Sequence, residues 1–454
     1  MHSNVALRSR GAVRSPELGA LATGIRLGAL FGPSVFGVTA AGVALPSVAS
    51  ALPGAPATTI WVLTVHALAL GVATAVFGRL ADAWGVRRTL LTGSVVLGLG
   101  ALVCLTAPSL QALVVGRFVL ATGSGAMMAA ALALAASIEP DLRAKVLAGF
   151  GATIAVFAGS ATLAGGLVTE LVTWRATLVL PVLSLAAVPL CLRAATQRPG
   201  SGQPVDILGA GLLAVAATTV VLLIQAHTLA LAPPLFAATA LLAALAAAAL
   251  AWRVRRAPEG FLPRALAADR AFVLASATGF GVFGGLFGAM YAVPQLLVHA
   301  HGWSVLDVGA ALLPGAVAGA ALARAASRLA ASRLGGHRLL AALATAFAIV
   351  LGLAGLTGAA IVPLIAGTFF GFAAFAVTQA VLTNQISRSV PAAQRGAAMG
   401  LLNLAFLTGG AVGSATAGAL SRPLGLPAAL TCVAVLPLVA GALAFRGRTG
   451  KTLR

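Results

Sequence analysis

Three long stretches of the 454-residue chain contain no charged residue. They lie between Arg26 and Arg79, between Asp206 and Arg253, and between Arg338 and Arg388. Each can hold two membrane helices, because about 20 apolar residues cross the hydrocarbon core of a bilayer. Across the chain, 60% of residues are apolar, 8% are charged, and the mean hydropathy is +1.04. These values indicate lipid as the solvent, and they predict an all-α membrane protein.

Shorter charge-free runs elsewhere in the chain are each close to the length of one membrane helix. Together with the three long stretches they predict about fourteen spans. We expect these spans at residues 27–50, 58–78, 89–107, 110–136, 146–169, 176–195, 207–227, 232–252, 271–296, 305–325, 338–356, 360–386, 396–419 and 425–445.

The basic residues follow a pattern along these expected spans. If the N-terminus is cytoplasmic, all of them except Arg117, Arg175 and Arg422 fall in cytoplasmic segments or at cytoplasmic span ends. This is the positive-inside distribution of membrane proteins, and it predicts that both termini are cytoplasmic. Because the basic residues are scattered between apolar segments, the net charge of +20 does not indicate nucleic-acid binding.

A weak internal repeat recurs at an offset of about 250 residues. Arg79-Leu80-Ala81 returns as Arg328-Leu329-Ala330, and Gly149 returns as Gly400. The offset pairs the first six spans with the last six and leaves two spans as an insertion, an arrangement that transporters use. The expected divisions are a cytoplasmic tail at 1–25, a six-helix half at 26–198, two inserted helices at 199–256, a second half at 257–446 and a tail at 447–454.

One loop motif follows the second expected span and reads Gly78-Arg79-Leu80-Ala81-Asp82-Ala83-Trp84-Gly85-Val86-Arg87-Arg88. Gly78 would let two helices approach closely, and Gly85 permits a turn with positive φ. Asp82 can face a helix N-terminus or the cluster of Arg87 and Arg88. The alternative is a helix end that carries an ordinary solvated basic loop.

The motif resembles the loop signature of the major facilitator superfamily. The resemblance implies that contacts of Gly78, Asp82, Gly85, Arg87 and Arg88 break when the protein switches between outward and inward states. Ala83 and Val86 depart from it, because the family usually has basic residues there. A weaker gating network would follow.

Other stretches are similar to the fourteen-helix drug:proton antiporter branch of that superfamily, which includes multidrug and antibiotic efflux permeases. They are Ala44-Leu45-Pro46, Trp61-Val62-Leu63-Thr64, Gly165-Gly166, Trp174-Arg175, Pro204-Val205-Asp206-Ile207-Leu208-Gly209 and Leu312-Leu313-Pro314. The branch usually carries an Asp and an Asn before Ala-Leu-Pro, where this chain has Gly37 and Gly42. It has Gly-Pro before Gly165-Gly166, where this chain has Ala161 and Thr162. The groups expected for proton coupling are therefore replaced.

Two polar residues within the spans are candidates for coupling. Arg117 is expected roughly 10 Å from the outer face, at 1.5 Å per helical residue, where a cation usually faces a cavity or a polar partner. The family carries an arginine at this place; the alternative is a side chain that snorkels outward. His66 is expected at a similar depth, and histidine is the side chain whose ordinary pKa lies near neutral pH, although a hydrogen-bonded packing histidine is the more frequent case.

Nine further polar and aromatic residues of the spans are candidates to line a substrate cavity. They are Tyr291, Gln295, Thr378, Gln379, Asn384, Asn403, Phe283, Phe287 and Phe372. By the repeat, their helices correspond to cavity-lining elements, and the aromatic rings suit an amphipathic substrate. Phenylalanines at this spacing can instead serve helix packing.

The favoured function is secondary active efflux of an amphipathic drug, antibiotic or secondary metabolite, driven by the proton gradient or the membrane potential. A facilitator or importer of a small metabolite is the alternative, and a membrane sensor without transport is a further one. The expected location is a bacterial-type inner membrane, and the expected partners are lipid, a small organic substrate and protons. We expect a monomer that binds no nucleic acid. Cofactor, metal and catalytic residues are not expected either, since no nucleotide-binding loop or metal-ligand cluster occurs in the spans.

Overall fold

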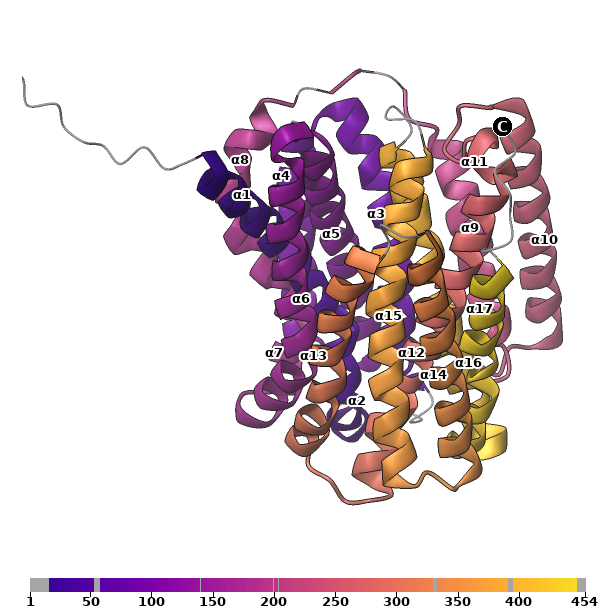
Figure 1. Cartoon of the computed structure of the whole chain (residues 1–454). Helices are drawn as coiled ribbons and strands as arrows, with labels where there is room; N and C mark the ends of the chain where they lie inside the picture. Colours follow the sequence, from indigo (N-terminus) through magenta and orange to yellow (C-terminus); the bar gives the residue numbers. More distant parts are fainter. Residues whose placement is uncertain are drawn as a thin grey trace, which may run out of the picture.

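The computed structural model is a bundle of long helices, and it describes residues 16–52, 58–138, 140–198, 200–202, 204–329, 333–390 and 395–446 (Figure 1). Within these ranges, twelve helical segments are long and apolar enough to cross a membrane. The all-helical membrane architecture expected from the sequence is thereby confirmed. Most of the expected N-terminal tail and all of the C-terminal tail lie outside the described residues, and the first helix begins at Pro16, inside the segment expected as the N-terminal tail.

In the first part of the chain, the described residues form eight α-helices and the two 3₁₀ segments η1 and η3. They are α1 (Pro16–Phe31), η1 (Gly32–Gly37), α2 (Thr39–Ala51), α3 (Trp61–Trp84), α4 (Val86–Thr106), α5 (Leu110–Ala136), α6 (Pro140–Leu171), α7 (Trp174–Leu178), η3 (Leu180–Ala187) and α8 (Val188–Thr196). The first expected span is the continuous segment Gly19–Ala51, wound as a 3₁₀-helix at η1. The sixth expected span is divided into α7, η3 and α8.

Prolines account for these irregular segments. Pro33 stands in the first turn of η1 and Pro181 in the first turn of η3. Proline has no amide hydrogen, and its ring disturbs the preceding helical turn, so the α-helical hydrogen-bond ladder is interrupted at both places. The two 3₁₀ segments pack against each other. Irregular backbone inside a membrane protein is tolerated where protein covers it, and all residues of η1 except Val35 are buried.

The second part of the chain continues with further helices. They are α9 (Ile207–Ile224), α10 (Pro233–Arg256), α11 (Arg264–Ala268), α12 (Arg270–His299), α13 (Val305–Leu329), α14 (Arg333–Leu356), α15 (Ile361–Ser389), α16 (Arg395–Val433) and α17 (Val435–Arg446). The last two expected spans lie in one apolar segment, Gly396–Arg446. That segment departs from helical geometry at Gly425, where φ is 81° and ψ is 159°.

Two pairs of helices make the most extensive contacts between the first part of the bundle and the second. Helix α3 packs along α16, and α6 packs along α13. The pair α9–α10 is attached beside the first of these contacts, because α9 touches both α3 and α16. Helix α10 stands at the edge of the bundle (Figure 1), and only 6% of its most apolar window is buried. Its apolar surface is therefore available to lipid.

Candidate functional site

Arg117 of α5 is fully buried, and its guanidinium is turned into the bundle. Nε donates to the carbonyl of Val62 at 3.1 Å and Nη1 to that of Leu178 at 2.8 Å, while Nη2 donates to the carbonyl of Gly37. The arginine therefore joins three other segments of the first part of the chain. The snorkelling alternative does not describe this side chain, since its charged end is enclosed by backbone.

Two of the three carbonyls lie where the helical ladder is interrupted. Gly37 ends η1, and Leu178 ends α7 immediately before η3. Backbone carbonyls at such junctions lack a regular helical partner and are free to accept from a side chain. The interruptions that the prolines cause therefore also leave the carbonyls of Gly37 and Leu178 free to accept from a buried cation. Among the described residues, the hydrogen bonds of Arg117 all go to backbone carbonyls.

His66 of α3 is fully buried and lies against Gly37. A Cβ atom on Gly37 would overlap the imidazole ring, so the absence of a side chain at residue 37 makes room for the histidine. Neither ring nitrogen makes a hydrogen bond of normal geometry with a described residue. The hydrogen-bonded packing histidine considered from the sequence is therefore not what is found. The structure brings His66 and Arg117 together at one backbone residue.

The polar candidates of the second part lie on α12, α15 and α16. Gln379 Nε2 donates to Asn403 Oδ1 at 3.3 Å, which links α15 to α16. Gln295 instead donates to the carbonyl of Tyr291, one turn earlier on α12, at 3.0 Å. Tyr291, Gln295, Thr378 and Asn403 are buried, and Asn384 is half-buried. The Thr378 hydroxyl has no hydrogen-bond partner among the described residues.

The aromatic candidates form a packed cluster. The ring centroid of Phe283 lies 4.4 Å from that of Phe375, 4.9 Å from that of Phe406 and 6.0 Å from that of Phe287. These separations are typical of aromatic pairs that stabilise helix contacts. Phe372 is buried on α15 outside these ring pairs. For Phe283 and Phe287 the structure therefore shows packing, the alternative raised at the sequence level, and Phe406 is a partner that the sequence analysis did not name.

The loop motif follows the expected geometry at Gly85 and departs from it at Gly78. Helix α3 ends at Trp84, Gly85 has a φ of 91°, and α4 begins at Val86. The close helix approach expected at Gly78 is wrong, because a Cβ there would meet no atom within 4 Å. Asp82 Oδ2 lies 3.9 Å from the Cβ position of Gly396, at the start of α16. The positive end of the α16 helix dipole stabilises a carboxylate at this position.

Arg87 and Arg88 of the same motif are exposed at the start of α4. Their position agrees with the solvated basic loop considered from the sequence. The neighbouring Arg79 is more deeply enclosed and donates to two backbone carbonyls of the segment that follows α10. The sequence analysis quoted Arg79 within the motif without giving it a role.

Gly165 and Gly166 lie at crossing points of α6 with two other helices. A Cβ on Gly165 would lie 2.9 Å from Ala40 of α2, and one on Gly166 would lie 3.0 Å from Leu306 of α13. Small residues allow helix backbones to approach in a membrane bundle. The remnant of the family motif is thus a packing position between α2, α6 and α13.

One polar contact between the two parts of the bundle escaped the sequence analysis. The hydroxyls of Thr64 on α3 and Ser414 on α16 lie 2.9 Å apart, and both side chains are fully buried. Thr64 is part of the quoted Trp61–Thr64 stretch, but hydroxyl residues are so frequent in membrane helices that sequence alone does not mark a pair. The described residues contain no group of three His, Cys, Asp or Glu side chains placed to hold a metal ion.

The helices, the buried cation and the loop motif define a multi-pass membrane protein of the transporter type. The chain matches the Major Facilitator Superfamily over residues 27–414 and again over residues 275–453. It belongs to this superfamily, a class of transporters and not of enzymes.

Relatives of this chain include proteins named for resistance and efflux. It is 29% identical over 323 residues to an uncharacterized MFS-type transporter of Mycobacterium tuberculosis (strain ATCC 25618 / H37Rv). The aligned region covers 68% of this chain and 45% of that relative. It is 30% identical to the puromycin resistance protein of Streptomyces alboniger, over 61% of this chain and 56% of the relative. It is 30% identical over 395 residues to the multidrug efflux pump LfrA of Mycolicibacterium smegmatis, and the aligned region covers 83% of this chain and 75% of the relative. The chain thus spans about half the length of several curated relatives that it matches.

Among solved structures, the human organic anion transporter MFSD10 shares the fold. The TM-score is 0.61 at 14% identity, and the alignment covers 95% of this chain and all of that one. At this identity the likeness concerns the fold.

Proposed function

We propose that this protein is a secondary transporter that exports amphipathic organic compounds. The observation that carries the proposal is the buried polar site formed by Arg117, His66 and the carbonyl of Gly37 inside a major facilitator fold. A buried cation and a buried imidazole are unfavourable in a bundle surrounded by lipid, and polar groups in that position usually serve transport. The relatives named for puromycin resistance and multidrug efflux support drug-like compounds as the substrate class.

Protons or the membrane potential drive the export in this proposal. Protonation of His66 places a second positive charge beside the guanidinium of Arg117, and like charges repel strongly where little water screens them. This repulsion favours separation of Arg117 from the Gly37 carbonyl and hence a different arrangement of α2, α3 and α5. The partly buried amide pair Gln379–Asn403 offers polar contacts to substrate from the other half in this proposal.

The proposed topology has fourteen spans with both ends in the cytoplasm. The twelve candidate spans become thirteen when the segment Gly396–Arg446 is divided at Gly425, and the segment 174–196, divided by η3, adds another. The distribution of basic residues supports cytoplasmic termini. In this arrangement α1–α8 and α11–α17 form the two halves of a monomer, and α9–α10 are inserted between them.

A facilitator that moves substrate without protons is the second candidate function. The observation in its favour is that, among the described residues, neither Arg117 nor His66 contacts a carboxylate. Such a transporter would equilibrate its substrate in either direction.

Transport in vesicles distinguishes the two functions. A panel of fluorescent aromatic drugs is followed in proteoliposomes with an imposed pH gradient and an uncoupler control. In the wild-type protein we expect drug movement that depends on the pH gradient. Arg117→Ala should abolish the movement, and His66→Ala should leave a movement that no longer responds to the pH gradient. Arg193→Ala is the matched control, because Arg193 is an exposed arginine in the last turn of α8. Movement of the drugs that ignores the gradient in the wild-type protein would favour the facilitator, and no movement would contradict both functions.

A further inference from the structure

The segment that precedes α9 is attached to the loop motif by backbone hydrogen bonds. The amide of Ser201 donates to the carbonyl of Asp82 at 2.8 Å, and the amide of Gly202 donates to that of Ala83 at 3.0 Å. Gly200 lies so close to this turn that a Cβ on it would overlap the backbone of Ala83. The segment on the N-terminal side of the α9–α10 pair is therefore fixed to the motif.

The segment that follows α10 is attached to the same motif through Arg79. Arg79 Nη2 donates to the carbonyl of Gly260 at 3.0 Å and to the carbonyl of Phe261 at 3.2 Å. Hydrogen bonds from a guanidinium are stronger than those between neutral groups. The motif is thus held by both segments that flank the helix pair.

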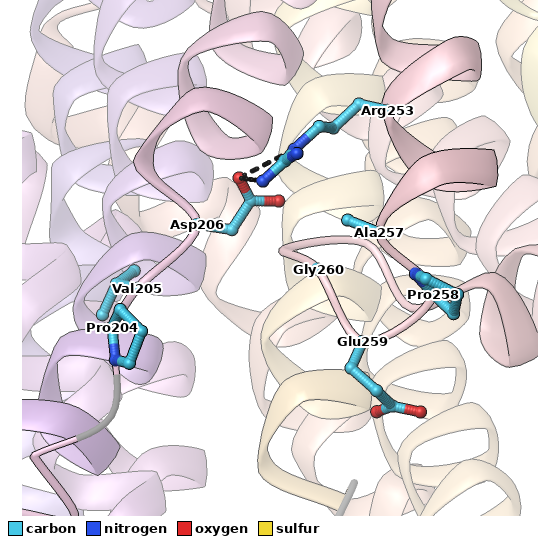
Figure 2. A pocket seen from close by; sticks show the side chains of 8 residues that line it. All are labelled: Pro204, Val205, Asp206, Arg253, Ala257, Pro258, Glu259 and Gly260. Carbon is cyan, nitrogen blue, oxygen red and sulfur yellow. Dashed lines mark hydrogen bonds and ion pairs between the residues drawn. The ribbon is translucent and has the colours of Figure 1, made fainter.

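Asp206 holds the second segment in the position that Arg79 requires. Its carboxylate accepts from the amide of Phe261 at 2.9 Å, and from Arg253 Nε at 3.2 Å and Nη2 at 3.0 Å. Figure 2 shows Asp206 and Arg253 facing each other, while Glu259 points away from the pair. All three residues line an open pocket of about 440 Å³. Phe261 is consequently held through its amide by Asp206 and through its carbonyl by Arg79.

Asp206 also accepts from the amide of Gly209 at 2.9 Å, which makes it the N-cap of α9. An N-cap uses one side-chain oxygen and serves only its own helix. The bonds to Phe261 and Arg253 reach a different segment and a different helix. The cap and the bonds from Arg253 use Oδ1, whereas Phe261 donates to Oδ2. Asparagine is as good an N-cap as aspartate, but its amide nitrogen cannot accept a hydrogen bond. With the amide oxygen in the place of Oδ1, Asp206→Asn therefore keeps the cap and loses the bond from Phe261 together with the negative charge that faces Arg253.

We propose that Asp206 is a positioning residue for the conformational switch, with Arg253 as its partner. It fixes Gly260 and Phe261 so that their carbonyls hold Arg79, and the inserted helices thereby stabilise the state in which Asp82 faces the start of α16. The inference rests on the proposed transport function, because it assigns the α9–α10 pair a part in the transport cycle. Loss of the Asp206 charge favours the alternative state.

The experiment measures the accessibility of the motif and transport in the same variants. In protein without native cysteines, Ala83→Cys is placed at a buried motif position and its rate of reaction with a maleimide is followed in detergent. We expect Asp206→Asn and Arg253→Ala to raise this rate about tenfold, as expected for the loss of one charge-assisted contact. Initial rates of drug extrusion in vesicles should fall by a similar factor. Arg255→Ala, an exposed arginine on the same helix, is the matched control and should match the wild type.

A combined variant tests whether Asp206 acts through Arg79. If it does, Asp206→Asn adds no further increase in labelling to Arg79→Ala, whereas independent structural effects would add. Wild-type labelling and extrusion rates in a folded Asp206→Asn protein would overturn the inference. Increased labelling in Asp206→Asn, in a preparation whose wild type moves none of the drugs, would support the positioning role and contradict the proposed function instead.

Discussion

The imidazole of His66 occupies the space that a side chain on Gly37 would fill. The two residues lie on different helical segments, and the carbonyl of Gly37 also accepts from Arg117. Glycine at residue 37 is therefore a condition for the histidine at residue 66, and the pair is the centre of the polar site.

Gly37→Ala should destabilise the protein because its methyl group overlaps His66. Overpacking of this kind costs about 1–3 kcal/mol. We expect a lower Tm in detergent and weaker extrusion. The double variant Gly37→Ala, His66→Ala should recover much of the stability, because it removes the overlap. Gly98→Ala is the control, since a Cβ on Gly98 would meet nothing within 4 Å. Equal losses in the single and double variants would contradict the arrangement.

Arg117→Lys should fail to replace arginine. A lysine ammonium is a compact point charge and does not reproduce the planar fork that reaches three carbonyls on three segments. Each buried acceptor left unpaired costs about 1–3 kcal/mol. We expect a lower Tm and loss of extrusion in both Arg117→Lys and Arg117→Ala, measured on protein that elutes at the same volume as the wild type. Full activity in the lysine variant would show that charge alone is sufficient.

A disulfide between α3 and α16 should arrest the transport cycle. The hydroxyls of Thr64 and Ser414 lie 2.9 Å apart, so cysteines at these two positions are close enough to be oxidised. In a protein without native cysteines, oxidation of Thr64→Cys, Ser414→Cys should stop extrusion, and reduction should restore it. Each single cysteine variant serves as a control. Undiminished transport in the crosslinked protein would mean that these helices do not separate.

The stability contributed by Asp206 should disappear in acid. Burial raises the pKa of this carboxyl, but hydrogen bonds from the amides of Phe261 and Gly209 and from Arg253 outweigh burial, and the pKa is lower than its ordinary value. A depressed folded-state pKa means that the contribution is complete above the unfolded value of about 3.9 and is lost as the pH falls through the folded value. The Tm difference between wild type and Asp206→Asn should therefore be constant near neutrality and shrink below about pH 4. A difference that grows in acid would contradict this sign.

The all-helical membrane architecture and the burial of Arg117 follow from the sequence. Charge-free runs predict helices because lipid offers no partner to backbone polar groups, and this reasoning holds at both Arg26–Arg79 and Asp206–Arg253. Arg117 was expected within a span and is found fully buried. These predictions succeed because they depend on local composition.

The partners of the site residues could not be predicted in the same way. The acceptors of Arg117 are backbone carbonyls, and backbone has no sequence signature of its own. The contact of Arg79 with Phe261 joins residues far apart in the chain, and its geometry depends on how two linkers fold. The close approach inferred for Gly78 was wrong, since a glycine in a motif does not by itself identify the helix it faces.

Because Arg117 is bound by main-chain oxygens, no single substitution in its surroundings can delete an acceptor. Random mutation can silence the site by replacing the arginine or by straightening the 3₁₀ segments that present Gly37 and Leu178. Loss-of-function screens should therefore collect changes at Arg117, Pro33 and Pro181, while the side chains of Val62 and Leu178 tolerate exchange for other apolar residues. The polar centre is in this sense robust to mutational drift, and its specificity is free to evolve through the side chains around it.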